Sequence, residues 1–139
     1  MAARENFLHL EGNIATDPEL RYTASGMAVV TLVVAHTERR QIDGQWQDVN
    51  TSYTDCVVFN KLAEYAADTF GKGARVTIDG SLRQRNWVDA TTGEKKYKHE
   101  VIADSVAASV RFNSVTLPGK GAPRVMAGGP EEGFEEESF

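Results

Sequence analysis

Apolar and polar side chains alternate along several segments of the chain, and a period of two is typical of β-strands. Phe7–Ile14 alternates strictly, whereas Met27–Ala35 is apolar on both faces, as expected of a strand that is covered twice. Gly80 lies inside a later segment and indicates a bend or bulge there. The pattern predicts five strands, at Phe7–Ile14, Met27–Ala35, Tyr53–Phe59, Arg75–Trp87 and Lys95–Ala103.

One segment between the third and fourth of these strands has the pattern of a helix. Asn60 is expected to cap it, residues 61–70 to form it, and Gly71 to end it. One stripe of this helix is expected to cover an opening of the sheet, and it consists of Leu62, Tyr65, Ala66, Thr69 and Phe70.

The order of these elements predicts the fold class. Asp43-Gly44 and Thr92-Gly93 are expected to form hairpin turns between neighbouring strands. Five short strands with one helix between the third and the fourth is the order of an OB-fold, a five-stranded barrel. The predicted class is therefore all-β with one short helix, and Val106–Leu117 is expected to add a further strand.

The last part of the chain differs in composition from the rest. Residues 118–139 hold three of the four prolines and five of the twelve glycines, and they end in an acidic run. Such a segment buries too little apolar surface to offset its ordering entropy. We expect residues 1–117 to form one domain and residues 118–139 to form a flexible, disordered tail.

The net charge changes its meaning once the chain is divided in this way. The formal charge is −5, from 15 basic and 20 acidic side chains in 139 residues, which by itself argues against a basic nucleic-acid binder. Residues 120–139 account for −3 of this charge and residues 1–119 for only −2. The body is therefore close to neutral, and the distribution of its charges matters more than their sum.

Several classes of protein and of site are not indicated by the sequence. The longest apolar runs are too short for a membrane span, and the first residues lack the pattern of a signal peptide, so a cytoplasmic protein is expected. Cys56 is the single cysteine, and the three histidines are scattered. We therefore expect no metal, no cofactor and no catalytic activity, with Cys56 a buried core residue.

Two of the predicted strands carry aromatic and basic side chains on one face. Alternation places Tyr53 and Phe59 on the same face of the third strand, and Arg83, Arg85 and Trp87 on the outward face of the fourth. Bases stack on exposed rings while guanidinium groups meet phosphates, so this face is typical of single-stranded DNA binding. Ordinary sheet packing and a subunit interface are the alternative interpretations of the rings.

Further basic and aromatic side chains flank this set. Each group of basic residues alone is typical of a solvated surface. Together with the interleaved rings, these groups fit a groove for single-stranded DNA better than a surface that recognises a duplex. The flanking candidates for single-stranded DNA binding are Arg39, Arg40, Trp46, Lys61, Lys72, Lys95, Lys96 and Lys98.

Over residues 4–112 the chain resembles the bacterial single-stranded DNA-binding proteins. The resemblance rests on GNIATDPELRYTASGMAV (12–29), VVFNKLAEYA (57–66), GKGARVTIDGSLRQRNW (71–87) and GEKKYKHEVIADSV (93–106). It implies an OB-fold that assembles as a homotetramer and coats single-stranded DNA in replication, recombination and repair. A nucleoid-associated location in the cytoplasm follows from that role.

The resemblance also implies roles for single residues. Trp87 and Phe59 match stacking rings of the family, and Tyr53 stands where a tryptophan is common. Lys61 and Lys72 match lysines that contact phosphates, whereas Arg40 replaces a stacking tryptophan. Asn86 is a further departure, because some members have a lysine there. Residues 106–117 are a further match, because they resemble a strand that clamps subunits together in some members.

The acidic tip resembles a segment that docks on replication and repair proteins in this family. The residues concerned are Glu135, Glu136, Glu137, Ser138 and Phe139. The tip keeps the acids and the final phenylalanine but lacks the usual aspartate run and the apolar-proline pair. Two alternatives stay open: a tail that only increases solubility, and an oligomeric OB-fold protein that recruits partners through its tail and binds DNA weakly.

Overall fold

The computed structural model describes residues 5–117. The elements in chain order are β1 (Phe7–Ile14), β2 (Arg21–Tyr22), β3 (Ala28–Ile42), β4 (Gln45–Phe59), α1 (Asn60–Thr69), β5 (Arg75–Val88) and β6 (Lys95–Ala108). All five predicted strands and the single predicted helix are present. The proposed tail at residues 118–139 lies outside the described residues.

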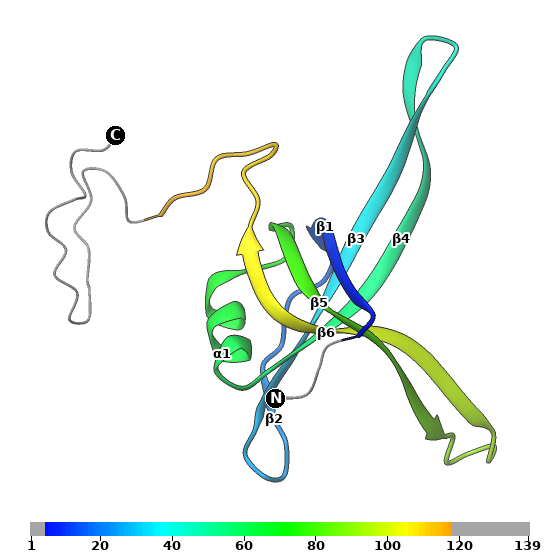
Figure 1. The fold of residues 1–139 in the computed structure, drawn as a ribbon, viewed down its shortest axis with the longest axis vertical. Helices are drawn as coiled ribbons and strands as arrows, with labels where there is room; N and C mark the ends of the chain where they lie inside the picture. The colour runs from blue at the N-terminus through cyan, green and yellow to red at the C-terminus, as the bar shows by residue number, and fades with distance from the viewer. Residues whose placement is uncertain (1–4, 118–139) are drawn as a thin grey trace, which may run out of the picture.

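Five of the strands close into a barrel (Figure 1). Their order is β1-β5-β6-β4-β3, and β1 also pairs with β3, which completes the ring. The pairs are antiparallel except β4 with β6, where Cys56 lies opposite Val101 in a parallel ladder. The two-residue strand β2 adds to the outer edge of β3. The predicted OB-fold is confirmed, with β2 as a strand that alternation could not reveal.

The barrel interior is filled by side chains that alternate inward along each strand. Val30, Leu32 and Val34 of β3 are fully buried, as are Cys56 and Val58 of β4. On α1 the buried residues are Ala63 and Ala66, and Leu62 and the C-cap residue Phe70 pack against the core. The predicted stripe is wrong at two positions, because Tyr65 and Thr69 point to solvent.

The start of the helix also differs from the prediction. The N-cap residue is Phe59, and no side chain within residues 5–117 caps the helix by a hydrogen bond. Asn60 is the first helical residue, and its φ of 63° lies in the left-handed region, which asparagine tolerates better than most residues. Asn60 thus turns the chain sharply from β4 into α1 instead of capping it.

Two long hairpins extend from the barrel in different directions (Figure 1). β3 and β4 continue beyond the predicted ends and meet at the predicted turn Asp43-Gly44, where both residues have positive φ. β5 and β6 form the second hairpin, with Gly93 in its turn. Outside the barrel both faces of a hairpin meet water, so the apolar alternation fades and the sequence understates the strand lengths.

The end of the described chain departs from one prediction. β6 includes Val106 and ends at Ala108, and residues 109–117 form no strand within the part of the chain that the structure describes. The expected strand Val106–Leu117 is therefore wrong as a separate element. In the described residues no helix is long and apolar enough to cross a membrane.

Candidate nucleic-acid interface

The register of β3 and β4 places one set of side chains on the outer face of the barrel, opposite the set that forms the core. Phe59, Val57, Asp55 and Tyr53 share this face of β4, and their partners on β3 are Val29, Thr31, Val33 and Ala35. We call it the groove face. Tyr53 is 66% exposed, whereas Cys56 on the other side is fully buried. The predicted split of the two faces is confirmed here.

The β5–β6 hairpin contributes the second part of the groove face. Arg83 lies opposite Glu100, Arg85 opposite Lys98, and Trp87 opposite Lys96. Directly opposed residues of an antiparallel pair share a face. The guanidinium of Arg85 lies over the Trp87 ring, 4.6 Å from its centroid. An ion pair from Lys98 to Asp55 joins this hairpin to β4 on the same face.

A bulge near Gly80 sets this alignment. Asp79 pairs with Ser105 but Gly80 pairs with Ala103, so Asp104 is an extra residue in β6. Gly80 is required because the strands approach closely, and a Cβ there would lie 2.2 Å from the carbonyl oxygen of Ile102. The predicted irregularity at Gly80 is confirmed, and it is this one-residue shift that brings Glu100 opposite Arg83.

A groove of about 500 Å³ lies where the strands β2 to β6 meet on this face. It joins predicted residues from distant parts of the chain: Phe59 from β4 with Arg83 and Arg85 from β5. Three charged or aromatic lining residues were missed by the sequence reasoning, namely Arg21, Tyr22 and Glu100. Arg21 and Tyr22 form a two-residue strand, which is too short for a periodic signal, although they lie in a segment of the family resemblance.

A second bulge decides where Trp46 lies. Glu38 pairs with Asn50 but Arg39 pairs with Asp48, so Val49 is an extra residue in β4. Strict alternation along β4 would put Trp46 on the face of the strand that does not carry Tyr53. The bulge reverses this, and Trp46 falls opposite Gln41 on the groove face. A salt bridge of 2.9 Å between Arg39 and Asp48 follows the same side of the hairpin.

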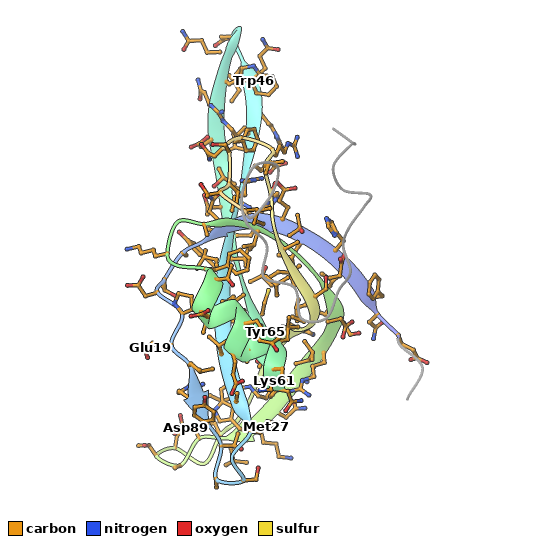
Figure 2. The ribbon with its side chains drawn as sticks, turned by 90° about the vertical axis from the view of Figure 1, so that its left-hand side faces the viewer. Glu19, Met27, Trp46, Lys61, Tyr65 and Asp89 are labelled. Carbon is orange, nitrogen blue, oxygen red and sulfur yellow. The ribbon has the colours of Figure 1, made fainter. Side chains whose placement is uncertain are left out.

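Some predicted residues do not join this set. Arg40 lies opposite Gln47, and Lys95 opposite Val88, so alternation turns both away from the groove face. Figure 2 shows Trp46 towards the far end of its hairpin, and Lys61 on α1. The Lys61 ammonium pairs with Glu64 at 3.4 Å, and Lys72 is exposed in the turn after α1. The predicted tail residues 135–139 lie outside the described residues.

Among residues 5–117, two side chains have a shifted pKa, and neither lines the groove. Burial raises the pKa of the Cys56 thiol to about 12, with a further contribution from the charge of Asp55. The Arg75 guanidinium, 2.7 Å from the Glu11 carboxylate, lowers the pKa of Glu11, and the Ser109 hydroxyl adds to this. The described residues include no cluster of histidine, cysteine and carboxylate side chains that could hold a metal ion.

Several known proteins are similar in sequence to this chain over most of its length. A single-stranded DNA-binding protein of Borreliella burgdorferi is 40% identical over 101 residues, covering 73% of this chain and 67% of that protein. The Mycobacterium leprae protein of the same name is 38% identical over 113 residues, covering 79% and 66%. Single-stranded DNA-binding protein 2 of Streptomyces coelicolor is 38% identical over 112 residues, covering 78% and 55%.

These matches leave between about a third and half of each relative's length uncovered. The model of the single-strand binding protein family matches residues 5–109. Both the OB-fold barrel and the sequence thus lead to one assignment: the chain belongs to the single-strand binding protein family.

Proposed function

We propose that this chain binds single-stranded DNA without sequence preference along the groove face. Bases stack on Tyr53, Phe59 and Trp87, and the phosphates meet Arg83, Arg85 and Lys98. The observation that carries the proposal is the groove, which joins Phe59 with Arg83 and Arg85 beside exposed rings. The names of the relatives support it. Stacking contributes about 1–3 kcal/mol per base and tolerates any base, a magnitude taken from proteins of this very family.

Single strands fit this face better than a duplex. Tyr53 is 66% and Trp87 38% exposed, and a ring presented to solvent needs a base whose own face is free. In a duplex that base face is covered by its neighbours. The helix α1 is no candidate for insertion into a major groove, because Ala63 and Ala66 tie its one apolar side to the barrel.

Two tyrosines on opposite faces allow a matched test. Tyr53 lies on the groove face, whereas Tyr97 lies opposite Asn86, on the other face of the β5–β6 hairpin. Their exposures, 66% and 65%, are nearly equal. We expect Tyr53→Ala to weaken poly-dT binding by roughly 5- to 150-fold, which is the stacking range, and Tyr97→Ala to leave it unchanged. No binding by the unmodified protein at low salt would refute the proposal.

The wider role is also a proposal. Family membership supports a protein that acts by binding, without catalysis or cofactor, on single-stranded DNA in replication, recombination and repair in the cytoplasm. The proposal of a homotetramer rests on family membership. Light scattering of the full chain measures its mass, and a monomer would contradict the assembly.

We propose that residues 1–117 form the DNA-binding domain and that residues 118–139 recruit replication and repair proteins. A terminal ring and carboxylates suit a basic, apolar pocket on a partner. Deleting residues 131–139 should abolish capture of such proteins while DNA binding persists. Unchanged capture would contradict docking through the tail.

A further inference from the structure

The cations of the groove face carry their own counter-ions. Arg83 Nη2 lies 3.4 Å from Glu100 Oε2, and Arg85 Nε lies 3.3 Å from Glu100 Oε1. Lys98 is paired with Asp55. Thus three of the cations proposed to meet phosphates are bound to carboxylates of the protein itself.

The two carboxylates are built into the sheet. The Glu100 side chain is only 4% exposed, while its two arginine partners are 51% and 47% exposed. The Asp55 side chain is 24% exposed against 42% for Lys98. In each pair the carboxylate is therefore the more buried partner, and the cationic group is the one that a ligand can reach.

We propose that Asp55 and Glu100 determine the specificity of the groove face by occupying its cations until a strand with stacking bases displaces them. This inference rests on the proposed function. A polyanion without bases would have to break these ion pairs and would gain little binding free energy, because its anionic groups would only replace the carboxylates as partners of the cations. A single strand also stacks its bases on Tyr53 and Trp87, and this stacking energy makes the exchange of carboxylate for phosphate favourable.

The same exchange has a signature in the salt dependence. Each phosphate neutralised on a single strand releases counter-ions and adds about 0.7 to the slope of log K against log salt. Lys98 must leave Asp55 to reach a phosphate, so the ion pair competes with the phosphate and lowers the number of phosphates that the unmodified protein neutralises. The slope of the unmodified protein should therefore be smaller than its basic residues suggest.

The variant Asp55→Asn tests this directly, and Glu38→Gln is the matched control. Both remove one negative charge from a partly exposed ion pair, but Glu38 pairs with Arg40 at 3.6 Å, on the side turned away from the groove. Glu100→Gln is a second test variant that keeps the shape of the buried side chain. Circular dichroism and thermal melting establish that each variant is folded.

The full chain is titrated with oligo-dT over a series of salt concentrations, with and without inorganic polyphosphate as a competitor without bases. For Asp55→Asn we expect a slope steeper by up to about 0.7 and binding tighter by roughly 1.5- to 5-fold at low salt. Polyphosphate should inhibit this variant more than the unmodified protein. Glu38→Gln should match the unmodified protein in all three measurements.

The outcomes separate this inference from the proposed function. Failure of the unmodified protein to bind oligo-dT overturns the proposed function and the inference together. Binding by the unmodified protein, with folded Asp55→Asn showing the same slope and the same polyphosphate sensitivity, overturns the inference alone. An equal gain in Glu38→Gln also overturns it, because net charge rather than the groove carboxylates would then control binding.

Discussion

Trp46 and Trp87 are the two tryptophans of the chain, so each can be made the single fluorescent reporter of its own hairpin. The Val49 bulge places Trp46 on the groove face, although alternation along β4 alone would not. We predict that in a Trp87→Phe background the fluorescence of Trp46 is quenched by poly-dT. Exchanging two neighbours, Trp46→Gln with Gln47→Trp, moves the ring to the opposite face and should abolish that quenching.

The magnitude follows from exposure and stacking. Trp46 is 61% exposed, so most of its ring is available to a base, whereas Trp87 is 38% exposed and has Arg85 over one face. A stacked base contributes about 1–3 kcal/mol. The exchanged variant should therefore bind poly-dT roughly 5- to 150-fold more weakly than its parent, with the composition of the chain unchanged.

Deleting Val49 tests whether quenching needs the bulge itself or only the Trp46 ring on the groove face. Removing Val49 takes out the extra residue but leaves Trp46 opposite Gln41, so the quenching should persist in the Val49 deletion. Trp87 in a Trp46→Phe background reports independently that the strand is bound. Quenching of Trp87 together with none of Trp46, or equal quenching of a tryptophan at positions 46 and 47, would refute the reasoning from register.

Three further predictions concern the barrel. Gly80→Ala should lower the free energy of unfolding by about 1–3 kcal/mol, because its Cβ would meet Ile102 at 2.2 Å; an unchanged urea midpoint would contradict this. Cys56, with its raised pKa of about 12, should react with a thiol reagent only after unfolding, and prompt reaction of the native protein would contradict its burial. Because the pKa of Glu11 is lowered in the folded protein, its carboxylate contributes stability above its ordinary pKa of 4.5, and this stability is lost as the pH falls through the folded pKa. In urea unfolding at neutral and at acidic pH, the free energy of unfolding should therefore fall less for Glu11→Gln than for the unmodified protein. An equal fall in both proteins would mean that the substitution is inert.

Within the barrel the sequence was a sufficient guide, because one face of each strand is buried there. Burial forces apolar residues to every second position, and this is why Cys56 was predicted to lie inside and Tyr53 outside. The order of strands and helix then led to the barrel. A closed OB-fold brings β4 and β5 to the same surface, so Phe59 and Arg83 line one groove although 23 residues lie between them in the sequence.

Outside the barrel this guide fails for a physical reason. A hairpin with water on both faces has no burial to enforce alternation, and a single extra residue reverses every side chain beyond it. Alternation from Tyr53 therefore could not place Trp46, and the basic character of Arg40 and Lys95 could not reveal that they face away. Alternation places Asp55 on the same face as Tyr53, but neither Asp55 nor Glu100 was predicted to pair with the cations, because acidic residues are not expected in a DNA-binding face.

Those carboxylates explain why net charge is a poor guide to this surface. A face that must hold a polyanion through free cations alone needs a positive sum, and such a face also attracts every other polyanion. A face whose cations are already paired can be neutral, since the ligand supplies the displacing charge and the rings supply the driving force. Under that arrangement the near-neutral body is compatible with DNA binding, and the stacking rings, which the charge count ignores, decide which polyanion binds.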